Sequence, residues 1–114
     1  MAGEKGLLGG SIQLMLLSLL SEKDYYGYQI IKELERRSES AFQLKEGTLY
    51  PVLHRMQNED YINAYEQEAE NGKRRKYYRI TDKGRRQLVT EREEWRQFTT
   101  SVSRVIGGSL YEGV

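Results

Sequence analysis

Apolar positions in the first half of the chain recur at helical spacing and predict three helices. From Leu7 to Leu20 the apolar residues fall on more than one face, which indicates a helix buried on several sides. A second helix is predicted over Gly27–Arg37, with an apolar stripe that includes Tyr28, Ile31 and Leu34. The third, over Glu46–Asn58, has apolar residues in an i, i+3, i+4, i+7 pattern. These residues are Leu49, Val52, Leu53 and Met56. The segment Ser21–Tyr26 is interpreted as a polar connection.

Pro51 complicates the start of the third helix. It lacks a backbone N–H, so it must lie near the helix start or distort the first turns. Thr48 is therefore an alternative N-cap for this helix.

After the third helix the period changes to two and predicts a β-hairpin. The two strands are expected over Tyr61–Glu68 and Arg75–Ile80, with Asn71-Gly72 as a two-residue turn. Centring the turn there sets Tyr65 opposite Tyr78. The same register sets Glu68 opposite Arg75 and Glu70 opposite Lys73, which are favourable cross-strand pairs.

A long last helix follows the hairpin. Thr81 is its predicted N-cap, Asp82 complements the helix dipole, and Gly107-Gly108 ends the helix after Ile106. Its apolar residues have heptad spacing, with Glu91 as the one polar residue in the series. They are Leu88, Trp95, Phe98, Val102 and Val105. So narrow an apolar stripe suits packing against another helix, including a second copy of itself.

Three helices, a two-stranded wing and a long helix are the order of a winged helix-turn-helix. The predicted fold class is α+β, mostly α. Residues 7–81 are expected to form the DNA-binding domain. Residues 82–107 are expected to form a dimerisation helix packed with the first helix of the chain.

Two surfaces are candidates for DNA contact. The third helix, which would enter the major groove, turns polar residues outward, although any amphipathic helix has a polar face. The wing gathers four consecutive cations at its tip, which repel each other unless an anion is near. The alternative is a solvated face partly neutralised by Glu66, Glu68 and Glu70. The predicted DNA-contacting residues are Lys45, Thr48, Tyr50, His54, Arg55, Lys73, Arg74, Arg75, Lys76 and Tyr78.

Trp95, the only tryptophan, has two interpretations. On the heptad stripe it would pack at a dimer interface. Alternatively, the two copies in a dimer would line a pocket for a flat aromatic ligand. The predicted interface residues are Leu8, Leu88, Trp95, Phe98, Val102 and Val105.

Composition narrows the function classes. The 114 residues fit one small domain, and the net charge of +1 means that DNA binding must depend on where charges lie. The chain has no Cys, and His54 is its only histidine, so we expect no metal site. No phosphate-binding loop, nucleophile elbow or GxGxxG motif is present, so we expect neither an enzyme nor a cofactor. No apolar run reaches the ~20 residues of a membrane span, and we expect a cytoplasmic protein.

Three segments together resemble the PadR family of bacterial transcriptional regulators. They are residues 26–30 (YGYQI), residues 46–56 (EGTLYPVLHRM) and residues 71–84 (NGKRRKYYRITDKG). The resemblance implies a homodimeric repressor that releases DNA when it binds a small molecule. It also implies a ligand site for planar aromatics, with Trp95 stacking on the ligand and Leu7, Gly10 and Leu14 lining the cavity.

Two positions depart from the drug-binding pattern of this family. Where such relatives carry an aromatic residue and an acid, this chain has Arg92 and Thr99. Thr99 stays in the predicted ligand site, but the missing acid argues against a cationic drug.

Three functional hypotheses remain at this point. The first is a repressor that responds to a ligand and binds a pseudo-palindromic operator. The second is a DNA-binding regulator without a small-molecule ligand. The third is a winged helix that binds only protein.

Overall fold

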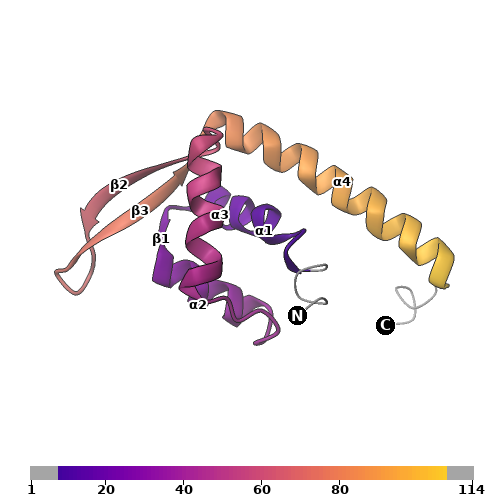
Figure 1. The fold of residues 1–114 in the computed structure, drawn as a ribbon, viewed down its shortest axis with the longest axis horizontal. Helices are drawn as coiled ribbons and strands as arrows, with labels where there is room; N and C mark the ends of the chain where they lie inside the picture. The colour runs from indigo at the N-terminus through magenta and orange to yellow at the C-terminus, as the bar shows by residue number, and fades with distance from the viewer. Residues whose placement is uncertain (1–7, 108–114) are drawn as a thin grey trace.

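The computed structural model describes residues 8–107, and its order of elements confirms the predicted winged helix-turn-helix (Figure 1). The described helices and strands are α1 (Ile12–Glu22), β1 (Tyr25–Tyr26), α2 (Gly27–Arg37), α3 (Glu46–Asn58), β2 (Ile62–Glu68), β3 (Arg74–Ile80) and α4 (Asp82–Ile106). The bounds of α2 and α3 are those predicted. The fold is mostly helical with one small sheet.

The first helix is shifted along the chain relative to its prediction. It begins at Ile12 and continues to Glu22. A turn precedes it, in which the Ser11 N–H donates to the Leu8 carbonyl at 2.9 Å. Two consecutive glycines before Ser11 explain the late start, because glycine disfavours a helix. Leu7 lies outside the described residues.

The predicted burial of α1 on several sides is confirmed. Its buried residues are Ile12, Leu16, Leu17, Leu19 and Leu20. They pack in one core with Ile30 of α2, Leu53 of α3 and Leu88 of α4. Because α1 contacts α3, β3 and α4, it is the central element of the fold.

A third strand was not predicted. The segment interpreted as a polar connection contains β1, which pairs antiparallel with β3 and makes the sheet order β1-β3-β2. Two residues are too few to show a period, so only the tertiary pairing identifies this strand. Its Tyr25 enters the core, and Tyr26 lies directly before α2.

The predicted hairpin register is wrong by one residue. Tyr65 pairs with Tyr77, and Glu68 pairs with Arg74. The loop has three residues, because the Ala69 N–H donates to the Lys73 carbonyl and the Gly72 N–H donates to the Ala69 carbonyl. Gly72 has φ +82°, as a three-residue hairpin with a left-handed glycine requires. A shift of one residue exchanges the two faces of a strand, so it changes which wing residues face solvent.

A close backbone contact fixes the start of α4. The predicted N-cap is confirmed, since the Thr81 hydroxyl accepts a hydrogen bond from the Gly84 N–H at 2.9 Å. A Cβ at Gly84 would collide with the Tyr61 carbonyl and lie 2.8 Å from Ile80 Cγ1. Glycine therefore lets α4 begin against the sheet.

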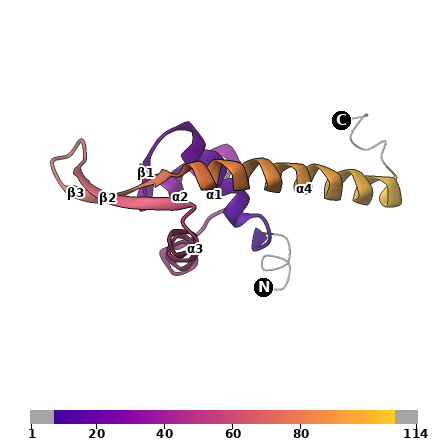
Figure 2. The same ribbon diagram turned by 90° about the horizontal axis from the view of Figure 1, so that it is seen from above.

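The hairpin and α4 extend in opposite directions from the body formed by α1–α3 (Figure 2). This gives the described chain extents of 51 × 29 × 25 Å. The far part of α4 (residues 95–106) projects beyond the other described helices (Figure 1).

Candidate DNA interface and adjoining pocket

The outer face of α3 is polar and exposed. Leu49, Leu53 and Met56 are buried beneath it, as the apolar pattern predicted. The side chains of this face that the sequence predicted to contact DNA are Thr48, Tyr50, His54 and Arg55, all of which are exposed. Thr48 is not the N-cap, because the helix begins at Glu46 and Lys45 occupies the cap position. Pro51 is accommodated inside the helix, and its ring lies on the exposed side.

Tyr50 is held against the start of α2. Its hydroxyl lies where a Cβ on Gly27 would be, so only glycine leaves room for it. Burial raises the pKa of Tyr50, and the charge of Glu46 raises it further, whereas Arg75 lowers it. The ring nevertheless remains 40% exposed. Tyr50 is therefore a fixed surface side chain on this face.

The four cations of the wing tip are not equivalent. Lys73 and Lys76 are exposed and form no ion pair with any described residue. Arg74 lies 3.6 Å from Glu66, and both side chains are mostly exposed, so the pair is weak. Arg75 is half-buried, with its guanidinium carbon 5.4 Å from the centre of the Tyr26 ring. Lys73 and Lys76 are thus the cations most available to an external anion.

Tyr78 does not belong to this surface. Its side chain is 3% exposed and lies in the core, where burial raises its pKa. The error in the hairpin register explains the misplacement. Tyr77, on the opposite face of β3, stacks on Tyr65 with ring centres 5.8 Å apart.

A cluster of polar and aromatic groups braces the base of the wing. The Tyr65 hydroxyl donates to the Asp24 carboxylate at 2.5 Å, which raises the pKa of Tyr65. Arg79 also binds Asp24, at 3.1 Å, and its guanidinium lies over the Tyr65 ring. These contacts connect the hairpin to the segment between α1 and α2.

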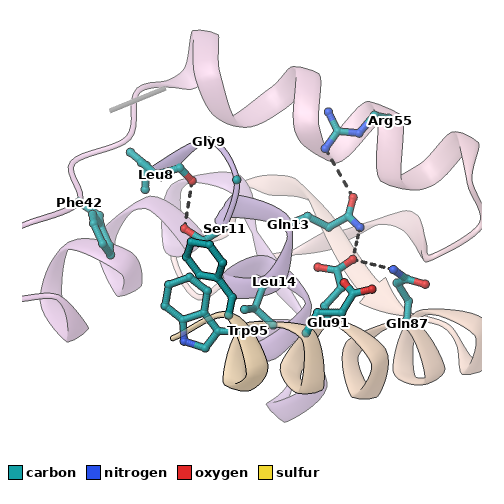
Figure 3. Close-up of a pocket in the computed structure, with 13 residues that line it drawn as sticks. Leu8, Gly9, Ser11, Gln13, Leu14, Phe42, Arg55, Gln87, Glu91 and Trp95 are labelled. Carbon is teal, nitrogen blue, oxygen red and sulfur yellow. Dashed lines mark hydrogen bonds between the residues drawn. The ribbon is translucent and has the colours of Figure 1, made fainter. Parts of the chain in front are cut away.

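A pocket of about 770 Å³ opens between α1 and α4, next to α3 (Figure 3). This volume falls within the ~300–1,000 Å³ of typical small-molecule sites. Leu14, Phe42, Trp95 and Phe98 supply apolar lining. The polar lining residues are Ser11, Gln13, Arg55, Gln87, Glu91 and Glu94.

The pocket contains part of the predicted ligand site. Gly10, Leu14 and Trp95 line it, and Leu7 lies outside the described residues. Thr99 is not among the lining residues. Its hydroxyl donates to the carbonyls of Trp95 and Arg96, at 3.0 and 3.2 Å, so it is directed along its own helix.

A chain of hydrogen bonds crosses the pocket wall from α3 to α4 (Figure 3). The Arg55 guanidinium donates to Gln13 Oε1 at 3.5 Å. The other end of the same amide, Gln13 Nε2, donates to Glu91 Oε2 at 2.5 Å. Gln87 Nε2 donates to the same carboxylate oxygen at 2.8 Å. One residue of the exposed α3 face is therefore also a residue of the pocket.

Several known proteins similar to this chain are transcriptional regulators. The model of the transcriptional regulator PadR-like family matches residues 16–90. The chain belongs to the PadR-like family. A transcriptional regulator from Clostridium thermocellum is 34% identical, with a TM-score of 0.80 over 87% of this chain and 96% of that one. A PadR-like regulator from Bacillus cereus is 32% identical, with a TM-score of 0.80 over 90% and 97%. An uncharacterized protein of Lysinibacillus sphaericus is 40% identical over 78% of this chain and 82% of its own.

The predicted interface residues of this PadR-like chain differ in their burial. Leu88 is 4% exposed and packs in its own core, so it is not available to a second subunit, contrary to prediction. Trp95, Phe98 and Val105 are 48%, 59% and 85% exposed. Leu8 and Val102 are partly buried.

Sequence reasoning missed several pocket residues. Gln13 is a polar residue within an apolar run, and Glu91 is the polar member of the heptad series. Each breaks an apolar pattern, and that was the available signal. That the two meet could not be predicted, because they lie 78 positions apart.

Of the described helices, none is both long and apolar enough to cross a membrane.

Proposed function

We propose that this PadR-like regulator binds DNA in a sequence-specific way through α3 and the wing. The observation that carries the proposal is the combination of an exposed polar α3 face with Lys73 and Lys76 at the wing tip, which form no ion pair with any residue that the structure describes. A helix that presents hydroxyl, imidazole and guanidinium groups suits base edges in the major groove. Lysines at a hairpin tip suit the phosphate backbone.

The residues proposed to contact the groove or its walls are Thr48, Tyr50, His54 and Arg55, with Lys45 at the backbone. Lys73, Arg74 and Lys76 would contact phosphates. Arg75 would act mainly by fixing the wing, since its guanidinium already lies over the Tyr26 ring. Tyr78 is left out because its side chain is buried.

The active form is proposed to be a homodimer. The exposed side chains of Trp95, Phe98 and Val105 give the far part of α4 an apolar stripe that no described residue of the chain covers. Helices with apolar residues at heptad spacing associate through that stripe. In this arrangement residues 82–107 serve dimerisation and residues 7–81 serve DNA binding. Two α3 helices would then enter successive major grooves ~34–36 Å apart, on a pseudo-palindromic operator.

A small molecule is proposed to release the regulator from its operator, which would make it a repressor. The pocket supports this, because Trp95, Phe98 and Leu14 offer flat and apolar surface while Gln13 and Glu91 offer polar contacts. The pocket also shares Arg55 with α3, so a bound molecule would lie in direct reach of the DNA-binding face.

Fluorescence anisotropy tests DNA binding. A pool of labelled duplexes, including the region upstream of the protein's own gene, is titrated at two salt concentrations. Nanomolar binding to one duplex, weakened steeply by salt and competed poorly by random DNA, is the expected result. Equal, weak binding to every duplex would contradict sequence specificity. No binding even at low salt would favour a winged helix that binds protein.

Trp95 fluorescence tests the ligand. Planar aromatic compounds of both charge signs are added to the dimer and to the dimer bound to the selected duplex. Quenching of Trp95 together with loss of bound DNA would support a ligand-released repressor. If no compound quenches Trp95 or displaces DNA, a regulator without a small-molecule ligand is favoured.

A further inference from the structure

The hydrogen-bond chain across the pocket has one weak and two strong contacts. Arg55 donates to Gln13 at 3.5 Å, at the long limit for such a bond. The bonds from Gln13 and Gln87 to Glu91, at 2.5 and 2.8 Å, have an ionised acceptor and are the stronger type. The amide is therefore fixed from the α4 side, whereas Arg55 can leave it.

Glu91 also determines which way the Gln13 amide faces. The carboxylate accepts only, so the NH₂ group of Gln13 must point to it. The carbonyl oxygen of the same amide is then left facing α3, where the Arg55 guanidinium supplies the donor. Glu91 thus acts on Arg55 through an amide, and the two charged groups form no ion pair within the described residues.

Arg55 occupies a position shared by two surfaces. It is exposed on α3, next to His54, and its guanidinium is turned toward the pocket and Gln13 (Figure 3). The bond to Gln13 engages one of the five guanidinium N–H groups and is at its length limit, so turning the guanidinium toward a DNA base or phosphate would break it.

We propose that Gln13 is a positioning residue for DNA binding, which holds Arg55 on the pocket side of α3 in the free protein. When the complex with DNA forms, Arg55 breaks its hydrogen bond to Gln13 and contacts DNA instead. The contact opposes DNA binding by a small amount, and it gives the pocket a direct physical connection to the recognition helix. The DNA part of this inference depends on the proposed function, and the holding of Arg55 in the free protein does not.

Two substitutions at position 13 should act in opposite directions. Gln13→Ala removes the acceptor and should tighten operator binding about twofold, the size expected for one weak hydrogen bond. Gln13→Glu gives Arg55 a charged partner and should weaken binding about threefold. If Gln13 had only a structural role, both substitutions would lower the stability of the protein and would change operator affinity in the same direction.

The matched control is Gln87→Glu. It places the same added charge in the same pocket wall beside Glu91, but Gln87 has no bond to Arg55 among the described contacts. Its effect on operator binding should be smaller than that of Gln13→Glu. Equal effects would show that added charge alone is responsible and would overturn the proposal.

A double-mutant cycle with Arg55→Ala completes the DNA test. In that background both position-13 variants should bind DNA as the Arg55→Ala protein does. Persistence of either effect without Arg55 would overturn the proposal. Thermal unfolding of each variant checks that the fold is intact.

The free protein supplies a second test that needs no DNA. The side-chain Nε–H signal of Arg55 in ¹⁵N NMR spectra, assigned by its loss in Arg55→Lys, reports how firmly the guanidinium is held. Gln13→Ala should make this group more mobile, and Gln87→Ala should change it less. If wild-type protein binds no duplex, the proposed function fails while this test still decides the role of Gln13. An unchanged Arg55 signal in Gln13→Ala would overturn that role.

Discussion

The body of the protein and the far part of α4 differ in how deeply their apolar side chains are buried. In the body, Leu16, Leu53 and Met56 are at most 1% exposed. In the far part of α4, Phe98 is 59% and Val105 is 85% exposed. Both regions are helical and carry apolar residues at regular spacing, so the spacing alone does not distinguish them. The difference teaches that the body completes its own core, whereas the far part of α4 has an apolar face that residues 8–107 do not cover.

The largest expected effect is in the core of the body. Leu53→Ala should lower the free energy of unfolding by ~3 kcal/mol, through lost burial and the cavity left behind. Chemical denaturation at one fixed chain concentration measures it. Val89→Ala, at a side chain 67% exposed, is the matched control and should change stability by less than ~0.5 kcal/mol. Similar losses for both would contradict the contrast between the two regions.

Next in size is an overpacked contact where the two regions join. Gly84→Ala should destabilise the protein by ~2 kcal/mol, because the new Cβ would meet the Tyr61 backbone, which cannot move aside cheaply. At Gly47 in α3 nothing lies within 4 Å of a new Cβ. Gly47→Ala should therefore be neutral or stabilising, by up to ~1 kcal/mol. Thermal unfolding compares the two, and a tolerated alanine at Gly84 would show that α4 does not need the close contact.

A charge on the far part of α4 should separate the subunits without unfolding the body. Phe98→Asp places this charge on the apolar stripe and should weaken dimerisation tenfold or more. A tenfold change corresponds to ~1.4 kcal/mol. Sedimentation equilibrium measures the change. Val89→Asp, on the same helix but off the heptad stripe, should leave the dimer intact. A dimer unaffected by Phe98→Asp would place the interface elsewhere.

The wing should contribute mainly through salt-dependent attraction to DNA. Replacing both Lys73 and Lys76 with Ala should reduce the slope of log affinity against log salt by up to ~2. Arg75→Ala should reduce it less, because that guanidinium is half-buried against Tyr26. Anisotropy titrations at several salt concentrations give the slopes. An unchanged slope in the double variant would remove the wing tip from the phosphate interface.

The smallest expected effect is at the surface of the body. Hydrogen bonds from Arg36 and Arg37 lower the pKa of Glu33 from 4.5 to about 2. A lowered pKa stabilises the fold above the ordinary pKa, and this contribution is lost as the pH falls toward 2. Glu33→Gln should therefore lower Tm slightly near neutral pH, and the difference should shrink in acid and in high salt. A difference that grows in acid would contradict this sign.

Periodicity predicted the helices well for a physical reason. The pattern of Leu49, Leu53 and Met56 spans about two helical turns and marks the buried side of α3. The N-cap at Thr81 was equally predictable, because the cap bond to Gly84 is local. The exposed face of α3 followed from the same pattern.

Contacts between distant segments were not predictable. The strand β1 exists only because Tyr25 and Tyr26 pair with β3, more than fifty positions away. The hairpin register depended on whether the loop has two or three residues, and Asn-Gly suits both. The burial of Leu88 and the meeting of Gln13 with Glu91 depend on how α4 crosses α1. These tertiary contacts determine which of the predicted site residues are exposed on the surface.

One measurement tests the division between a DNA-binding body and a dimerising helix most directly. The duplex selected in the anisotropy screen is titrated with wild-type protein and with Phe98→Asp, and the number of chains per duplex is determined at saturation. The account predicts two chains of wild type on each duplex. It also predicts that Phe98→Asp loses at least tenfold in affinity although α3 and the wing are unchanged. One chain per duplex, with equal affinity for both proteins, would contradict it.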